Sequence, residues 1–460
     1  MKKWLVLSII VISGVAFTGV LIIGEYEPVP IPPSTQRTGG DVQKGYEYLT
    51  TGEYVKGGIP YKTWLMGVGK SKTNYLQRTG NNADISHEYN TVTATNGEVL
   101  VAPNCMQCHA QVFDNKLVMG LGNTFIDFTH NEKLNVKNLR AVESLLKLTA
   151  PNRYKAAKPF LDVAETISPY LIVNTRGVNT ADRLAAVLVA HRDPVTFKWN
   201  PEAQLDIPES VIPSDVPPWW LLKKKNAMFY NGFGRGDFGR FLMASNLLTV
   251  NDTAESAEVD SHMPDLLAYI YSLEPPKYPG NIDKTLAGEG EKIFNKKCGG
   301  CHGSYGDNEK YPNLLIPEAV IQTDSLLYKN NYSSPQFVEW FNKSWFTSGD
   351  HPARLEPFMG YIAPPLDGIW VTAPYLHNGS VPTLEALLNS DLRPQYWSRN
   401  FDKPDYDYEK VGWKYTKEAK ALDKFTYNTD QPGYGNYGHT FGDKLTEKER
   451  KAVLEYLKTL

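Results

Sequence analysis

The chain has 460 residues, enough for two or three domains that each bury a hydrophobic core. Its formal net charge of −3 gives no electrostatic reason to expect a nucleic-acid partner. All four cysteines fall within two short motifs, so no thiol remains for a structural disulfide.

The N-terminus starts with two lysines and continues with an uncharged, mostly apolar run over 4–23. This pattern is typical of an export signal, and the run is also long enough to span a bilayer. Because no A-x-A cleavage site follows, we favour an anchor over a removed signal peptide for 1–24. The lysines would stay in the cytoplasm, so the rest of the chain is expected in the periplasm, anchored to the cytoplasmic membrane. The proline-rich stretch 25–38 predicts a stiff spacer.

Two C-x-x-C-H motifs carry the clearest chemistry: Cys105-Met106-Gln107-Cys108-His109 and Cys298-Gly299-Gly300-Cys301-His302. The pattern is the attachment signature of a c-type haem, in which the two thiols form thioethers and the histidine ligates the iron. A zinc site would use both cysteine pairs close together, and neither zinc nor a thioredoxin-like pair needs the adjoining histidine. The sequence therefore predicts two covalently attached c-type haems, with His109 and His302 as iron ligands.

Residues 39–273 are predicted to form a first cytochrome c domain, enlarged by an insertion over roughly 130–260. The pattern over 181–190 predicts a helix, and the stretch 92–101 is the best candidate for a short strand. Consecutive prolines and tryptophans beside three lysines, over 216–225, do not suit a regular amphipathic helix. We expect a loop there whose Trp219 and Trp220 pack on or between the haems, with ordinary core packing as the alternative.

Two apolar stripes have similar spacing, one at 266–273 before a pair of prolines and one at 453–460 at the end of the chain. The second follows Thr446-x-x-Glu449, a capping box that starts a helix. The parallel predicts a linker over 274–284 and a second cytochrome c domain over 285–460, although any amphipathic helix has such a stripe. The expected fold class is mainly α, with two cytochrome c-type domains and little strand.

The segment 372–384, with the sequence Thr-Ala-Pro-Tyr-Leu-His-Asn-Gly-Ser-Val-Pro-Thr-Leu, resembles a signature of the bacterial di-haem cytochrome c peroxidase superfamily. That superfamily includes the enzyme that matures methylamine dehydrogenase and the rubber oxygenases. The Pro-Pro-Trp-Trp segment and the Gly438-His439-x-Phe-Gly run make the resemblance closest to the rubber-oxygenase-like branch. The resemblance covers both haem motifs, this segment and the final helix. It implies that His377 lies near the haems without ligating an iron.

For the second haem, the resemblance implies His439 as sixth ligand, because the rubber-oxygenase pattern has a histidine shortly before the last helix. Classical relatives use a methionine at the position that is Asp391 here. Met359 is the rival ligand, at a plausible distance after the second haem motif. A pair of histidines would lower the reduction potential relative to histidine with methionine.

For the first haem, the sixth ligand stays open. His130 is one candidate, whereas in the rubber-oxygenase branch this haem is open and lined by aromatic side chains. The stretch 227–236 is the most similar to such a lining. Its candidates are Phe229, Tyr230 and Phe233 as a shield for a bound oxygen species and Arg235 as a partner of a haem propionate. A glycine-rich turn with buried aromatics is the alternative.

The sixth ligands decide the function, because an open iron binds peroxide or oxygen and a filled one passes electrons. The leading hypothesis is a peroxidase-like oxidoreductase. Its N-terminal haem activates hydrogen peroxide, and its C-terminal haem relays electrons from a small donor protein such as a cytochrome, through Trp219 or Trp220. The alternatives are an oxygenase acting on an organic substrate and a membrane-tethered electron carrier without catalysis. Classical relatives also hold a calcium ion, but no compact carboxylate cluster places one here.

Overall fold

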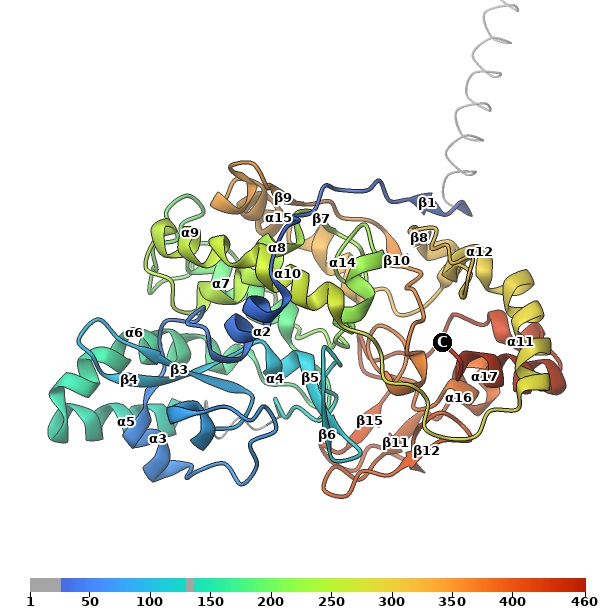
Figure 1. Ribbon diagram of the computed structural model, residues 1–460, viewed down its shortest axis with the longest axis horizontal. Helices are drawn as coiled ribbons and strands as arrows, with labels where there is room; N and C mark the ends of the chain where they lie inside the picture. Colours follow the sequence, from blue (N-terminus) through green and yellow to red (C-terminus); the bar gives the residue numbers. More distant parts are fainter. Residues whose placement is uncertain (1–25, 130–135) are drawn as a thin grey trace, which may run out of the picture.

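The computed structural model describes residues 26–129 and 136–460 (Figure 1). The predicted anchor over 1–24 and the candidate ligand His130 lie outside these residues. Among the residues described, no helix is both long and apolar enough to cross a membrane.

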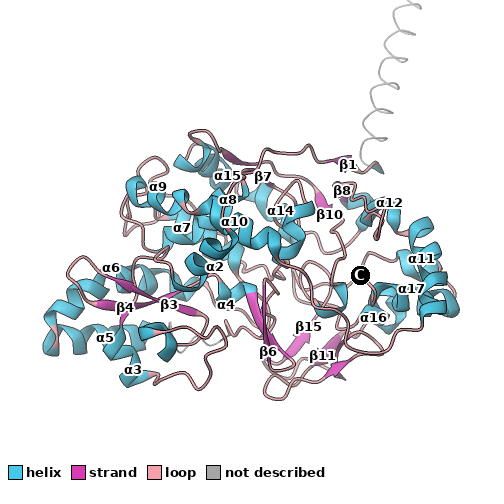
Figure 2. Ribbon diagram, in the orientation of Figure 1, coloured by secondary structure: helices cyan, strands magenta, loops and turns pink. Residues whose placement is uncertain are grey.

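Helices dominate the picture, with short strands between them (Figure 2). In the first part of the chain the α-helices are α2 (Val42–Thr51), α3 (Tyr61–Gly67), α4 (Met106–His109), α5 (Val136–Thr149), α6 (Pro151–Ile167), α7 (Ala181–Ala190), α8 (Phe238–Leu242), α9 (Thr253–Ser261) and α10 (Met263–Ser272). Those that follow are α11 (Lys284–Lys297), α12 (Gly299–His302), α13 (Glu318–Ile321), α14 (Leu326–Ser333), α15 (Pro335–Asn342), α16 (Leu384–Leu388) and α17 (Glu447–Leu457).

The strands pair antiparallel in small sheets. Two of the three-stranded sheets are β1 (Val29–Pro30), β8 (Leu314–Pro317) and β10 (Gly360–Ile362), and β2 (Ile59–Pro60), β4 (Val99–Pro103) and β3 (Tyr89–Thr93). A further one is β14 (Thr416–Lys417), β11 (Tyr396–Ser398) and β15 (Thr426–Asn428). The two-stranded pairs are β5 (Ala110–Phe113) with β6 (Lys116–Met119), β7 (Gly234–Gly236) with β9 (Ala353–Leu355), and β12 (Tyr406–Asp407) with β13 (Gly412–Trp413).

One helix pair recurs in both halves of the chain. Helix α2 packs against α10, and α11 packs against α17. In each pair a glycine lies at the crossing: a Cβ on Gly45 would overlap the carbonyl of Asp265, and a Cβ on Gly290 would overlap that of Ala452. The absent side chains let the two backbones approach closely. The recurrence supports the proposal of two related cytochrome c-type units.

The capping box at the last helix is confirmed. The Thr446 side chain accepts from the backbone N–H of Glu449, and the Glu449 carboxylate accepts from the backbone N–H of Thr446. Helix α11 begins with a similar device, because Asp283 accepts from the two N–H groups of its first turn. The helix then leads directly into Cys298, so its end positions the second haem motif.

Three local expectations change in the structure. The stretch 92–101 is a hairpin, because Gly97 turns the chain at a φ of +82° between β3 and β4. The stretch 216–225 contains a 3-10 helix over Trp219–Lys224. Residues 26–38 of the predicted spacer pack on the body of the protein: β1 pairs with β8, and Arg37 forms ion pairs with Asp237 and Asp260.

The hydrophobic core does not stop at the predicted linker. Helix α10 ends at Ser272 and α11 starts at Lys284, with neither helix nor strand between them. A large buried cluster nevertheless joins Phe113 and Trp220 from the first half to Phe294 and Trp370 from the second. The domain boundaries therefore stay a prediction, and the two halves share apolar packing that couples them.

Candidate functional site: two cysteine-histidine centres

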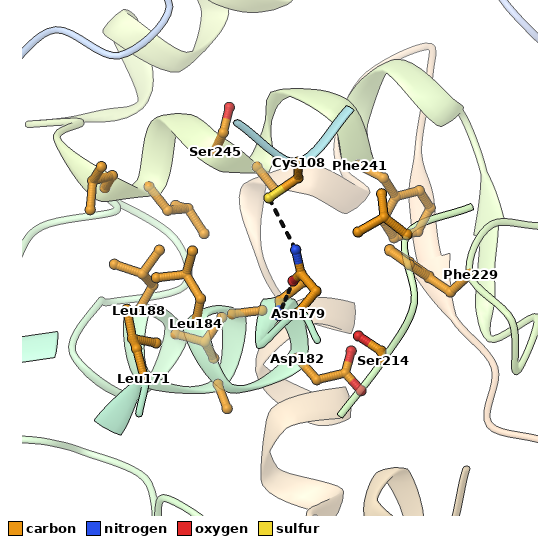
Figure 3. Close-up of a pocket in the computed structure, with 18 of the residues that line it drawn as sticks. Cys108, Leu171, Asn179, Asp182, Leu184, Leu188, Ser214, Phe229, Phe241 and Ser245 are labelled. Carbon is orange, nitrogen blue, oxygen red and sulfur yellow. Dashed lines mark hydrogen bonds between the residues drawn. The ribbon is translucent and has the colours of Figure 1, made fainter. Parts of the chain in front are cut away.

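The first haem motif opens onto a large cavity of about 980 Å³. Cys105, Cys108 and His109 all line it, at the end of β4 and along the short helix α4. Figure 3 shows its wall, with leucines on one side and Phe229 and Phe241 on another. Much of the lining is apolar, including Leu184, Leu188, Leu222, Met228, Phe233 and Leu247. Such a chamber is suited to enclosing a large apolar group such as a porphyrin.

His109 is held against Trp219. Their ring centroids lie 4.5 Å apart with the planes 17° from parallel, so the two rings stack. Burial lowers the pKa of His109 to about 3, which keeps the imidazole neutral, as a metal ligand must be. Its Nδ1 atom has no hydrogen-bond partner within the described part of the chain.

The thiols stand here for the thioether sulfurs of an attached haem. The side-chain amide of Asn179 donates to Cys108 Sγ at 3.1 Å (Figure 3). The backbones of Asn179 and Ser214 exchange two hydrogen bonds, of 3.1 and 3.2 Å. These two hydrogen bonds fix the segment that follows Ser214 relative to Cys108.

The predicted aromatic lining is brought to the cavity. Phe229, Tyr230 and Phe233 all line it, and Phe229 adopts a φ of +68° with 36% of its surface exposed. A left-handed backbone is costly for a bulky residue, so surrounding contacts must hold it there. Two aromatic contacts do so, with ring centroids 5.1 Å from Phe233 and 5.6 Å from Phe241.

Arg235 lies elsewhere. It is buried in β7 and its Nε atom pairs with Glu356 at 3.4 Å, and it is not among the residues that line the cavity. The cavity instead takes a cation from Lys225, which is 8% exposed. Burial lowers the pKa of Lys225 to about 8. Of the two cations, Lys225 is therefore the one placed to meet an anionic group in this chamber.

At the second motif, the structure brings His439 to His302. Their ring centroids lie 6.2 Å apart and their planes make an angle of 62°. His302 Nδ1 lies 2.8 Å from the carbonyl of Pro364, and since a carbonyl only accepts, this nitrogen carries the proton. The Nε2 atom of His302 is thereby left with the lone pair that a metal bond needs.

His439 is half-buried, and the loss of solvation together with the nearby His302 lowers its pKa to about 3. Arg393 holds its segment: the guanidinium donates to the carbonyls of Asn436 and Gly438 at 2.7 Å, and to that of His439 at 3.2 Å. The backbone N–H of His439 donates to the carbonyl of Ile321 at 2.9 Å. The left-handed φ of +45° at His439 is fixed by these contacts.

The rival ligand is placed differently. Met359 lies directly before β10, is 37% exposed, and its carbonyl accepts from the N–H of Glu318 at 2.9 Å. Asp391 lies in a 3-10 helix over Ser390–Leu392. Of the two candidates, His439 is the one with a described ring contact to His302. The geometry favours the histidine pair.

The two tryptophans make different contacts. Trp219 stacks on His109, and Trp220 donates from its indole nitrogen to the carbonyl of Asp367 at 2.8 Å. Asp367 follows shortly after Pro364, the residue whose carbonyl binds His302. Trp219 thus contacts the histidine of the first motif, and Trp220 binds the backbone segment whose Pro364 binds His302.

His377 lies behind the cavity wall. Its ring stacks on Tyr361, with centroids 4.1 Å apart, and its Nε2 atom lies 3.0 Å from the Tyr361 hydroxyl, which donates its proton to the carbonyl of Asp324. Burial lowers the pKa of His377 to about 3. Its carbonyl accepts from the backbone N–H of Asp215 at 2.7 Å, so it supports a residue that lines the cavity.

Several residues at these centres carry no recognisable pattern in the sequence. They are Asn179, Asp182, Asp215 and Lys225 at the cavity, and Arg393 at the second centre. Each stands in an irregular segment or a helix start far along the chain from either motif. Within the described ranges, no group of three or more histidine, cysteine, aspartate or glutamate residues could hold a further metal ion.

The residues present fit a c-type haem at each centre. The first has two cysteines, a neutral histidine with an unpaired nitrogen, and a chamber lined by apolar groups. The second has two cysteines and two neutral histidines. At the first, Cys105, Cys108 and His109 would hold the haem, and at the second Cys298, Cys301 and His302 would, with His439 opposite.

Comparisons with known proteins agree with this chemistry. Residues 360–398 match a family described as RoxA-like, cytochrome c-like. The chain is 31% identical over 256 residues to uncharacterized protein y4iJ of Sinorhizobium fredii, covering 41% of each chain. It is 26% identical over 290 residues to uncharacterized protein y4iM of the same organism, covering 55% of this chain and 66% of the relative. The chain thus spans less than two thirds of either relative. The matched domain indicates a haem-binding c-type cytochrome oxidoreductase and supports the RoxA-like branch.

Proposed function

We propose that this protein is a di-haem c-type oxidoreductase whose first centre is the site of chemistry and whose second centre relays electrons. The observation that carries the proposal is the difference between the centres. A cavity of about 980 Å³ opens at His109, whereas a second imidazole, that of His439, faces His302. An open centre admits a small ligand and a doubly ligated one passes electrons.

A c-type haem supplies, when bound, an iron that exchanges electrons and accepts a small ligand where its sixth position is free. The chain's own residues set the conditions. Cys105 and Cys108 would hold the group covalently, and Trp219 fixes the ring of His109. The apolar lining makes the chamber less polar than water, which strengthens the polar interactions inside it.

Hydrogen peroxide is the leading substrate. Its reduction consumes two electrons and two protons and yields two water molecules. The electrons would come from a small donor protein such as a reduced cytochrome and pass from the second centre through Trp220 and Trp219. A donor of this kind and the predicted export segment both fit an extracytoplasmic protein tethered to the cytoplasmic membrane.

An oxygenase acting on an organic substrate is the second candidate, and the lining of the cavity favours it. Its aromatic wall, with Phe229 and Phe233, is suited to an apolar substrate. The match of residues 360–398 to a RoxA-like domain also favours an oxygenase.

Electron paramagnetic resonance of the oxidised, full-length protein tests the proposal. We expect one high-spin ferric signal from the first centre and one low-spin signal from the second. Two low-spin signals that persist after half-reduction would contradict the proposal and favour an electron carrier. Oxidation of a reduced cytochrome by peroxide then separates a peroxidase from an oxygenase, for which oxygen consumption needs an organic substrate.

A further inference from the structure

A carboxylate that the sequence did not single out faces the first cavity. Asp215 lines it together with Tyr230, and the Tyr230 hydroxyl donates to Asp215 Oδ2 at 2.7 Å. The Asp215 backbone is fixed on both sides: its N–H binds the carbonyl of His377, and the preceding Ser214 is paired with Asn179. Because Asn179 binds Cys108 Sγ, the carboxylate is held by a continuous chain of contacts to the haem-attachment motif.

The surroundings of Asp215 are poor in charge. Arg399, which follows β11, is the cation whose field reaches it, and that field lowers the pKa of the carboxyl. Tyr230 and the N–H of Val216 act in the same direction, and Tyr427 of β15 is the other titratable group close enough to interact. Burial outweighs them and raises the pKa of Asp215 to about 7. The carboxyl can therefore hold or release a proton near neutral pH.

Arg399 does not neutralise Asp215 by a direct ion pair. Its guanidinium lies over the rings of Phe125, Phe401 and Trp413, with distances of 4.6–5.1 Å to the centroids, and it donates to the carbonyl of Thr124. It is thus committed to aromatic and backbone partners. A carboxylate locked in an ion pair would be a poor base, whereas one held by a phenol and a remote cation keeps its capacity to exchange a proton.

We propose that Asp215 is the general acid–base residue of the first centre, accepting the proton of a protic small ligand that enters the cavity and returning it during reduction. The inference rests on the proposed function. For hydrogen peroxide, one O–H bond breaks as the proton moves to the Asp215 carboxylate. When the O–O bond breaks, that proton goes to the departing oxygen, which leaves as water.

The overall step balances with H₂O₂, two electrons and two protons giving two H₂O. The electrons come from the reduced donor protein, and the two net protons come from solvent. Tyr230 keeps its own proton, and its hydroxyl orients the carboxylate through the hydrogen bond it donates. Its role is positioning, so a phenylalanine there should disturb the geometry of Asp215 and, because the lost hydrogen bond lowers the pKa of the carboxyl, raise that pKa further.

Cyanide binding to the oxidised, full-length protein tests the inference without turnover. Neutral hydrogen cyanide enters an apolar cavity and must lose its proton to bind an iron as the anion, so a base in the cavity accelerates association. Asp215→Asn preserves shape and can still accept from Tyr230. We expect it to slow cyanide association at neutral pH by roughly 10²-fold, the lower range for general acid–base catalysis. We also expect the rise of the wild-type rate with pH towards about 7 to disappear.

Two companions make the result specific. Asp215→Glu should restore part of the rate, because the carboxylate is kept with a longer reach. Asp206→Asn, at an exposed aspartate that lines the same cavity, should bind cyanide at the wild-type rate. The low-spin signal of the second centre serves as the folding check for every variant.

The possible outcomes test the role of Asp215 and the proposed function separately. Equal association rates and pH profiles in wild type and Asp215→Asn would overturn the role of Asp215 and leave an open first centre intact. Failure of the wild-type protein to bind cyanide would overturn the proposed function and, with it, this inference. A slow Asp215→Asn with a normal Asp206→Asn and a partly restored Asp215→Glu supports both.

Discussion

The imidazole rings of His302 and His439 lie against each other, with their centroids 6.2 Å apart and their planes at 62°. A metal–imidazole nitrogen bond is about 2 Å long, so two rings on opposite sides of one metal have centroids about 6 Å apart. The observed separation fits the proposal that both imidazoles would ligate one iron. The hydrogen bond from His302 to Pro364 and the contacts of Arg393 with the His439 segment hold both rings from outside.

Replacing His439 with alanine should open the second centre. Without the second imidazole, the iron held by His302 has a free position, and its low-spin ferric signal should become high-spin. Electron paramagnetic resonance of the oxidised variant measures the change. Met359→Leu is the matched control and should leave the signal unchanged, since Met359 is partly exposed. The opposite pattern, with only the methionine variant altered, would replace His439 by Met359 as ligand.

Arg393 should be indispensable for holding His439. Its guanidinium donates to five carbonyls, those of Ala386, Leu387, Asn436, Gly438 and His439. A lysine has a single ammonium group, which cannot reach all five carbonyls. We expect Arg393→Lys to lower the free energy of unfolding by about 3 kcal/mol, since hydrogen bonds to a charged donor contribute about 1.5–3 kcal/mol each and do not add fully. Denaturant unfolding measures the loss.

A spectroscopic readout accompanies that measurement. If Arg393 acts through His439, the lysine variant should also show a partial high-spin signal at the second centre. Arg354→Lys provides the comparison, because Arg354 is an exposed arginine of β9 that pairs with Glu356. A destabilised Arg393 variant with a fully low-spin second centre would mean that the arginine supports the fold and not the ligand.

The haem motifs and the capped final helix could be predicted because their determinants are local. Cys-x-x-Cys-His and Thr446-x-x-Glu449 each place their functional groups within one turn of chain. His439 could also be predicted, from a resemblance and not from periodicity. The structure then supplied what the resemblance lacks, a ring contact to His302.

The remaining site residues depend on long-range folding. Asp215 meets Tyr230 inside the cavity, and Asn179 meets Cys108 across 71 positions of sequence. No local pattern encodes such encounters. Arg235 shows the converse: its place in a glycine-rich aromatic run suggested a propionate partner, but pairing of β7 with β9 directs it to Glu356. Lys225 reaches the cavity although its neighbours, Lys223 and Lys224, form ion pairs elsewhere.

The glycine crossing of α11 and α17 provides a matched pair of variants. Gly290→Ala should push the helices apart, because its Cβ would overlap the carbonyl of Ala452. Overpacking of this kind costs about 1–3 kcal/mol. Gly288→Ala, in the same helix with no atom near its Cβ position, should instead stabilise by up to about 1 kcal/mol through helix propensity. Urea unfolding measures the free energy of unfolding of both variants. If it changes in the same direction in both, helices α11 and α17 are not tightly packed at Gly290.

Asp182 should make stability depend on pH. Burial raises the pKa of its carboxyl to about 6, above the usual 3.8, and one of its oxygens has no hydrogen-bond partner in the described residues. The folded state therefore holds this proton more tightly than the unfolded chain does. The stabilisation is complete below about pH 4 and is lost as the pH rises through about 6. At 1.36 kcal/mol per pKa unit, the loss amounts to about 3 kcal/mol.

Asp182→Asn removes that ionisation while keeping the size of the side chain. We expect the variant to gain stability relative to wild type as the pH rises from about 4 to about 6, and the difference to stay constant above about pH 7. Thermal or denaturant unfolding across this range measures it, with Asp206→Asn on the rim of the same cavity as control. A stability difference that does not change with pH would mean that the Asp182 carboxyl ionises in the folded protein as it does in the unfolded chain.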